Sequence, residues 1–327
     1  MDDICGVVQT TSPSLYTHVG GYLPPNLLYV ILGPTASGKT KLGVALAETI
    51  DGEIISIDSR QVYRGMDIGT GKDLQEYKHI PYHLIDICDP KQRYDVTQFQ
   101  QDFHRAYRNI LSDKKNPIAV GGTGLYMQSL FTFQPYMHVP VNITLREKLA
   151  GLDKDELIQR IHLYRVPDDF QIDFTSHKRL IRAVEIMEAL QGGFRILDSP
   201  SFSYPAILFG INPTLETRRK RISDRLTQRL EGGLEAEVRE LLSQGLTHDD
   251  LQYFGLEYKY TSLYIQGRFD RCSFFNKLET EIHRYAKRQM TFFRKMEKDG
   301  LSIHWLRADN MDDQLEEVLH IITNKKG

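Results

Sequence analysis

Residues 33–40 read Gly33-Pro34-Thr35-Ala36-Ser37-Gly38-Lys39-Thr40 and match the phosphate-loop pattern GxxxxGK(S/T) at every fixed position. An apolar stretch at 27–32 precedes the loop and a helical pattern at 39–50 follows it, which is the strand–loop–helix context that such a loop requires. The glycines let backbone N–H groups turn inward around an anion, and the helix N-terminus adds positive partial charge. Lys39 would reach the terminal phosphates, and the hydroxyl of Thr40 would be offered to Mg²⁺. The stretch therefore predicts a ligand that carries a diphosphate or a triphosphate, without saying which.

Outward from this loop, strand and helix patterns alternate, which predicts an α/β fold with a P-loop NTPase-like parallel sheet at its core. Further strands are expected at 53–57, 83–87, 117–120 and 204–211. Helices are expected at 97–112, 143–165, 176–191, 215–243, 274–298 and 313–323. Little strand signal is present in the middle of the chain. We therefore expect a flexible leader, a core in two parts and a helical insertion domain between those parts, at 1–26, 27–134, 135–203 and 204–327 in chain order.

The composition of the 327 residues is that of an ordinary globular protein, with 41% apolar and 26% charged residues. Three cysteines without a CxxC or Cys/His ligand spacing indicate reduced thiols in a cytoplasmic protein, and no zinc site. No apolar stretch reaches the length of a membrane span, so we expect no membrane partner.

Positive charge is concentrated in two segments, although the net charge of the chain is −2. Residues 215–230 hold six Lys or Arg against two acids, and residues 283–298 hold six against one acid. In the second segment one side of the expected helix carries Arg284, Lys287, Arg288, Thr291, Arg294, Lys295 and Lys298. Such a face suits docking to an RNA backbone, but it is also typical of a lysine-rich helix surface in water.

Asp58 follows the strand expected at 53–57, at the edge where parallel α/β sheets bind their ligands. In an NTPase this aspartate would help to hold Mg²⁺, in a transferase it would act as a base, and otherwise it would cap a helix. Three classes of protein therefore stay open on these residues. They are a nucleotide kinase or NTPase, a transferase whose substrate is another diphosphate, and a nucleotide-gated binding module without chemistry.

A longer series of motifs separates these classes. Asp58 opens the stretch DSRQVYRGMDIGTGK (58–72). It is followed in order by HLIDICDP (83–90), AVGGTGLY (119–126), KRLIRAVEI (178–186), EAEVREL (235–241) and AKRQMTFFRK (286–295). Together with the phosphate loop, these motifs resemble the tRNA dimethylallyltransferase family from about residue 28 to 306. A relative that prenylates free adenine nucleotides would not need the two basic helices or an insertion that grips RNA.

The resemblance implies a reaction and a role for several residues. The phosphate loop, with Mg²⁺, would hold the diphosphate of dimethylallyl diphosphate, and the acceptor would be the adenosine just 3′ of the anticodon in tRNA. Asp58 would be the general base, Thr123 a hydrogen-bond partner of the substrate RNA near the reacting base, and Arg225 a ligand of the donor's diphosphate. Arg225 shares a helix face with Arg218, Arg221 and Arg229, which we interpret as a solvated stripe.

The same resemblance implies a set of tRNA contacts. They are Asp58, Ser59, Arg60, Gln61, Thr123, Arg146, Lys178, Arg179, Leu180, Ile181, Arg182, Lys287, Arg288, Gln289, Met290, Thr291, Phe292, Phe293 and Arg294. Residues 252–257 match a further contact segment, in which Gly255 is kept and Leu256-Glu257 replaces an aromatic-plus-basic pair. We expect the protein to act as a monomer.

Overall fold

The computed structural model of the chain describes residues 26–196 and 202–324, so all of the expected leader except Asn26 lies outside the described residues. Two compact units are present. The first contains residues Met1–Phe131 and Tyr204–Gly327 and carries the sheet, and the second contains Thr132–Ser203 and is helical. Among the described helices, none is long and apolar enough to cross a membrane.

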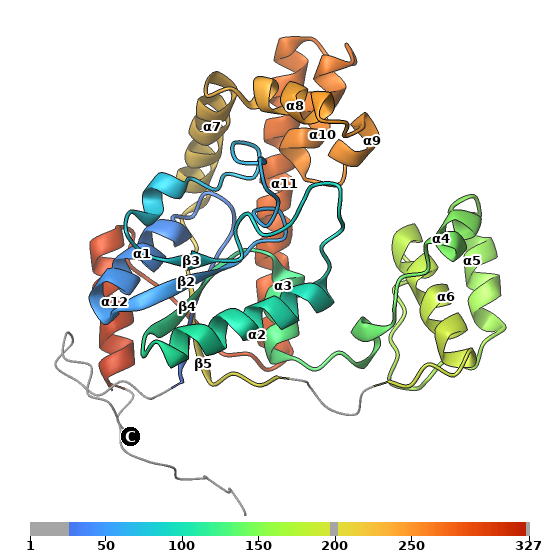
Figure 1. Cartoon of the computed structure of the whole chain (residues 1–327), viewed down its shortest axis with the longest axis horizontal. Coiled ribbons are helices and arrows are strands. Elements are labelled where there is room, and N and C mark those ends of the chain that lie inside the picture. The colour runs from blue at the N-terminus through green and yellow to red at the C-terminus, as the bar shows by residue number, and fades with distance from the viewer. Residues whose placement is uncertain (1–25, 197–201, 325–327) are drawn as a thin grey trace, which may run out of the picture. The chain divides into compact units, whose positions relative to one another are not determined.

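The sheet of the first unit has six strands in the order β3-β2-β4-β1-β5-β6, and every neighbouring pair is parallel. The strands are β1 (Leu28–Leu32), β2 (Gly52–Ile57), β3 (Tyr82–His83), β4 (Asn116–Gly121), β5 (Ala206–Gly210) and β6 (Ile303–Trp305). This arrangement confirms the predicted α/β fold with a parallel P-loop core. All five residues of β1 are buried, because the strand lies between β4 and β5 with helices on both faces (Figure 1).

Helices cover both faces of the sheet. On one face, α1 (Lys39–Ile50) and α12 (Met311–Asn324) pack on Tyr29 and Ile31 of β1 in one apolar cluster. On the other face, α2 (Val96–Ser112) packs on β2 and β4 and contacts α3 (Gly124–Phe131), as Figure 1 shows. A capping box starts α2, since Asp95 and Gln98 each accept a hydrogen bond from the other's backbone N–H.

Two predicted helices are in fact pairs of shorter ones. The helix expected at 215–243 is broken into α7 (Leu215–Glu231) and α8 (Leu234–Ser243), because Gly233 has a φ of 105° that no helix contains. The helix expected at 143–165 is broken into α4 (Ile143–Ala150) and α5 (Lys154–His162), where Asp153 caps the start of α5. Both predictions of a continuous helix were wrong, because the apolar periodicity persists across the breaks.

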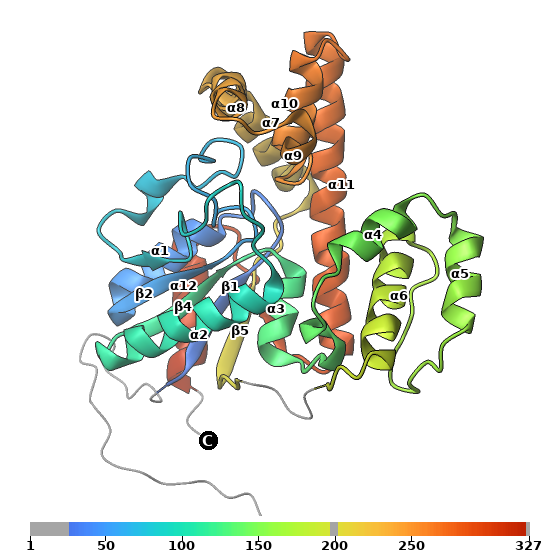
Figure 2. The ribbon, with the colours of Figure 1, turned by 45° about the vertical axis from the view of Figure 1, so that its right-hand side comes forward.

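The prediction of a strand at 83–87 was also wrong beyond His83. Leu84 and Asp86 have positive φ angles of 63° and 57°, which exclude extended backbone. Beyond α7 and α8, the first unit contains α9 (His248–Leu251), α10 (Leu256–Ile265) and α11 (Arg271–Lys298). Figure 2 shows α11 as a long helix that runs past the sheet.

The second unit is built on α4, α5 and α6 (His177–Gln191). Leu157, Leu180 and Val184 lie in its apolar cluster. A buried carboxylate, that of Glu185, accepts two hydrogen bonds from the guanidinium group of Arg146 and one from Arg182. The pKa of Glu185 is lowered overall, because these hydrogen bonds outweigh the effect of burial, which by itself raises the pKa.

Candidate active site

The phosphate loop joins β1 to α1 at the carboxyl edge of the sheet. Gly38 takes a φ of 94° before the first residue of α1, a conformation that favours glycine, and among the described residues no side chain caps this helix end. The first N–H groups of α1 therefore face the loop and can receive an anion. Lys39 donates a hydrogen bond from Nζ to the carbonyl oxygen of Pro34 (2.7 Å), which holds the ammonium group over the loop.

Positive charge is in excess around Lys39. The pKa of Lys39 is lowered to about 8, mainly by desolvation in the surrounding protein and also by the nearby charge of Arg225, while only the carboxylate of Asp58 acts in the opposite direction. The ammonium group of Lys39 thus lies near the guanidinium group of Arg225, and the carboxylate of Asp58 does not balance both positive charges. A diphosphate would supply the missing negative charge.

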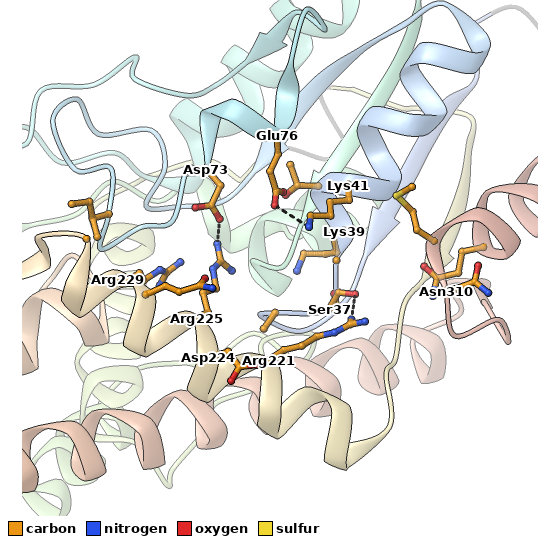
Figure 3. A pocket seen from close by; sticks show the side chains of 18 of the residues that line it. Ser37, Lys39, Lys41, Asp73, Glu76, Arg221, Asp224, Arg225, Arg229 and Asn310 are labelled. Carbon is orange, nitrogen blue, oxygen red and sulfur yellow. Dashed lines mark hydrogen bonds and ion pairs between the residues drawn. The ribbon is translucent and has the colours of Figure 1, made fainter.

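A cavity of about 880 Å³ opens on the loop between α1 and α7. Figure 3 shows Lys39, Arg221, Arg225 and Arg229 at this cavity. Arg221 donates to the carbonyl oxygen of Ser37 (3.3 Å), and Arg225 pairs with Asp73. Four cationic side chains from two helices are therefore gathered where an anionic ligand would lie.

A second cavity of about 640 Å³ contains the reacting groups predicted from the sequence. Asp58, Thr123 and Gln61 line it, together with aromatic side chains of Tyr253 and Phe292. The two cavities share four lining residues, namely Lys39, Thr40, Arg225 and Arg229. The phosphate loop therefore borders both cavities, and a ligand bound there by its phosphates could extend its other end toward Asp58.

Asp58 is the first residue after β2, and its carboxylate is held by its own turn. Oδ1 accepts hydrogen bonds from the backbone N–H groups of Arg60 (2.8 Å) and Gln61 (3.3 Å). Oδ2 accepts none from the described part of the chain. One carboxylate oxygen is thus fixed by the backbone, and the other is left to accept a proton or a metal ion.

Thr123 lies in the turn that follows β4, beside Asp58. Its Oγ1 accepts a hydrogen bond from the N–H of Ser59 (3.2 Å), which leaves the hydroxyl hydrogen to be donated to a ligand. The turn can approach β2 this closely because Gly121 has no side chain: a Cβ there would lie 2.1 Å from the carbonyl oxygen of Ile57. Neighbouring strands therefore bring the two predicted reacting residues together.

Gln289 of α11 ties the phosphate loop to this glycine turn. Its Oε1 accepts from the N–H of Thr35 (2.8 Å), and its Nε2 donates to the carbonyl oxygen of Gly122 (2.9 Å). The side chain is buried. Gln289 was predicted as a tRNA contact, but both ends of its amide are already used to hold the two loops in register.

The residues fit a magnesium ion only together with a phosphate ligand. No group of three or more His, Cys, Asp or Glu side chains in the described ranges could hold a metal by itself. Thr40 lines both cavities, and Asp58 lines the second one. Mg²⁺ is commonly bound in this way, by one or two protein ligands and the oxygens of a substrate phosphate.

Comparisons with known proteins identify the family. A family model described as IPP transferase matches residues 61–296, and a second one, described as Isopentenyl transferase, matches residues 26–79. The chain belongs to the IPP transferase family. This confirms the resemblance that the ordered motifs indicated.

Curated members of the IPP transferase family match nearly the whole chain. The chain is 45% identical over 306 residues to tRNA dimethylallyltransferase 2 of Phocaeicola vulgatus, covering 91% of this chain and 98% of the relative. It is 44% identical over 295 residues to tRNA dimethylallyltransferase 1 of Geotalea uraniireducens, covering 90% and 96%.

Solved structures agree with the fold. The full-length tRNA isopentenylpyrophosphate transferase of Bacillus halodurans is 31% identical, with a TM-score of 0.66 over 91% of this chain and 95% of that one. A eukaryotic dimethylallyltransferase acting on tRNA, 22% identical, shares the fold with a TM-score of 0.67 over 86% of this chain and 74% of that one.

The segment 287–294 of α11, which was predicted from the sequence to contact tRNA, has two different faces. Exposed side chains on it are Lys287, Arg288, Thr291 and Arg294, and Phe292 is partly exposed. Met290 and Phe293 are buried and belong to the packed side of the helix. Only the first group has side chains that a binding partner could reach.

The insertion segment 178–182 divides in the same way. Leu180 is buried, and Arg182 donates to the carbonyl oxygen of Val139 (2.7 Å) as well as to Glu185. Arg146 is bound to Glu185 through two of its nitrogens. Lys178 and Arg179 are exposed, and Arg179 pairs with Asp173. Ile181 is partly buried. Leu180 is packed inside the unit, and Arg146 and Arg182 form hydrogen bonds within it. These three residues therefore stabilise the unit.

The interpretation of Arg229 as a solvent-exposed residue was wrong. Arg229 was interpreted as part of a solvated stripe, but only 12% of its side chain is exposed, and it pairs with Glu257 at 2.7 Å inside the second cavity. Arg221 also lines the first cavity. The signal was present in the Leu256-Glu257 departure from the family pattern, because a new carboxylate needs a cationic partner. Tyr253 lies within the contact segment 252–257 predicted from the sequence, and the guanidinium groups of Arg60 and Arg93 lie 4.5 and 4.1 Å from its ring centroid.

Proposed function

We propose that this chain transfers a dimethylallyl group from dimethylallyl diphosphate to the exocyclic N6 amine of the adenosine 3′-adjacent to the anticodon in tRNA, and releases diphosphate. One observation carries the proposal: the phosphate loop with its cations borders the same cavity as Asp58 and Thr123. The names and functions of the family relatives support the choice of prenyl donor and tRNA acceptor.

The donor binds through its two phosphates. The N–H groups of the phosphate loop, Lys39 and Arg225 bind the diphosphate and balance the charge that develops on it as it leaves. Thr40, together with phosphate oxygens of the donor, would hold Mg²⁺, which would supply further positive charge beside the leaving group. Such preorganised charge is the largest contribution to catalysis in many enzymes.

The acceptor enters the second cavity. The adenosine amine attacks C1 of the donor; the new N–C bond forms while the C–O bond to diphosphate breaks. Asp58 accepts the proton that the amine loses, on the oxygen that its own turn leaves open. Thr123 donates a hydrogen bond that orients the base. The base must leave its stack to reach this cavity, at a cost of a few kcal/mol that is smallest in a loop.

The RNA docks on the exposed basic side chains. Lys287, Arg288 and Arg294 of α11 contact phosphates, and Arg60 stacked on Tyr253 lies at the cavity itself. In the insertion unit, Lys178 and Arg179 serve the same purpose. All of the reacting groups come from one chain, which supports a monomer, and a tRNA substrate supports a cytoplasmic location.

Family membership favours prenyl transfer over a kinase-like reaction or binding without chemistry. A free adenine nucleotide is the remaining alternative acceptor. The test is incubation with labelled dimethylallyl diphosphate and, in separate reactions, tRNA or AMP, followed by analysis of the labelled product. We expect label in tRNA at the adenosine beside the anticodon. Label in AMP and none in tRNA would overturn the proposal.

A further inference from the structure

The motif at 235–241 has no role in the reaction described so far. Its second acid, Glu237 of α8, receives the backbone of a distant loop. Oε2 accepts hydrogen bonds from the N–H groups of Asp67 (2.8 Å) and Ile68 (2.7 Å), and Oε1 accepts one from the N–H of Gly69 (2.9 Å). Oε1 also accepts from the hydroxyl of Tyr258 (2.7 Å). Four donors, three of them consecutive amides, thus converge on one carboxylate.

The far end of the same loop contacts the active site. The carbonyl oxygen of Gly71 accepts hydrogen bonds from Nη2 of Arg225 (3.2 Å) and from Nε2 of Gln61 (3.0 Å). Gln61 in turn donates its own N–H to Asp58. A hydrogen bond from the N–H of Gly71 to the carbonyl oxygen of Ile68 (3.1 Å) closes the turn between the two ends. Glu237 is therefore connected to Arg225 through the hydrogen-bonded backbone of residues 69–71.

Both glycines of the loop are packed closely against side chains. A Cβ at Gly69 would lie 2.4 Å from the ring of Tyr258, and a Cβ at Gly71 would lie 1.7 Å from Nη2 of Arg229 and 2.5 Å from Nη2 of Arg225. Residues 69–71 also line the second cavity, so their position fixes part of its wall. A shift of this backbone toward the arginines would therefore displace them.

We propose that Glu237 is a positioning residue that anchors the loop 66–71, and so holds Arg225 against the donor's diphosphate. The identity of the ligand rests on the proposed function; the anchoring itself concerns any diphosphate in this site. A carboxylate is required because it offers two oxygens and no donor. Glutamine has one oxygen, so its NH₂ group would face either the Gly69 N–H or the pair from Asp67 and Ile68, and at least one amide would lose its acceptor.

The test is the binding of inorganic diphosphate to the full chain, measured by calorimetry in the presence of Mg²⁺. Glu237→Gln should bind diphosphate about 10-fold more weakly than the native protein, the scale expected when a buried amide loses its partner. The matched control is Glu235→Gln, on the same helix, where the glutamate is exposed and pairs with Arg239. This control should bind diphosphate as the native protein does.

Coupling to Arg225 distinguishes positioning from a general loss of structure. In an Arg225→Ala background, Glu237→Gln should have little further effect on diphosphate binding, because the residue through which it acts is gone. An equal loss in both backgrounds, or unchanged binding in Glu237→Gln alone, would overturn the proposal. If Glu237→Gln does not fold, Tyr258→Phe removes one of the four hydrogen bonds and keeps the ring. It should weaken diphosphate binding by about 2- to 3-fold and leave tRNA binding unchanged; unchanged diphosphate binding would then refute the anchor.

The diphosphate titrations contain no acceptor RNA. If the native chain prenylates no tRNA but the diphosphate results hold, the proposed function fails and the anchoring role stands. If tRNA is prenylated while Glu237→Gln binds diphosphate like the native protein, the reverse is true.

Discussion

Donor binding should depend on pH through Lys39. In the free protein, burial and Arg225 hold the pKa of this lysine at about 8, so the charged form is disfavoured. A bound diphosphate favours the charged form and raises that pKa. Binding therefore takes up a proton wherever free Lys39 is neutral and bound Lys39 is charged. Affinity is therefore highest well below pH 8, falls as the pH rises above the free-state pKa, and stops falling only above the raised pKa of the bound lysine.

The magnitude follows from the pKa. About nine in ten free molecules carry the charged lysine at pH 7, and about one in ten at pH 9. If Lys39 stays charged in the complex, affinity for the donor should fall about 10-fold between these two pH values. At pH 8 binding should take up about half a proton, and at pH 6 almost none.

Calorimetry of dimethylallyl diphosphate binding in two buffers of different ionisation enthalpy measures both quantities. The control is Lys39→Arg, because the guanidinium group stays charged over this range and should abolish the proton uptake. Lys39→Ala should weaken binding by about 2–4 kcal/mol at pH 7, the scale for removing one member of a buried charge pair. An affinity that does not change from pH 7 to pH 9, or a proton uptake that persists in Lys39→Arg, would refute the assignment of the lowered pKa to a donor-binding lysine.

Three further predictions follow from the site. The affinity for tRNA should fall steeply with salt, and Lys287→Ala with Arg294→Ala should flatten the logarithmic slope by about two units, one for each lost phosphate contact; the same slope in the double variant would leave that face merely solvated. Asp58→Ala should lower the single-turnover rate by about 10²–10⁴-fold at saturating donor and tRNA, with tRNA binding nearly intact; a defect that disappears at high Mg²⁺ would instead make Asp58 a metal ligand. Gln289→Leu should cost about 1–3 kcal/mol of unfolding free energy in urea, because the Thr35 amide and the Gly122 carbonyl lose their partner; an unchanged unfolding midpoint would show that water replaces it.

Much of the core could be predicted from the sequence, because parallel strands are short apolar runs separated by helical periods. The phosphate loop, β1, β2, β4 and β5 carry this signal, and Asp58 follows directly from where β2 ends, whereas Thr123 was assigned a role only from the resemblance to the family. Elements without a clear apolar period were missed. The ten-residue α10 is an example, because its buried positions include Thr261 and Ser262, and β6 has only three residues.

The contacts that shape the site could not be predicted, because they join residues far apart in the chain. Gln289 reaches the phosphate loop across 254 positions, and Glu237 reaches the loop at Asp67 across 170. Neither residue differs, in the sequence, from an ordinary polar residue of an amphipathic helix. A helical pattern shows which side of a helix is buried, but not which backbone groups its polar residues will meet.

The pairing of charges around the donor site determines which cations remain for the leaving group. Arg229 is neutralised by Glu257 and is nearly buried, so it shapes the wall of the cavity and adds little free charge. Arg225 uses Nη2 for both Asp73 and Gly71, while its Nε and Nη1 make no hydrogen bond within the described residues. Its guanidinium group can therefore bind phosphate without releasing the loop that orients it. We therefore predict that Arg225 and Lys39 bind the diphosphate, and that Arg229, which is nearly buried in its pair with Glu257, does not.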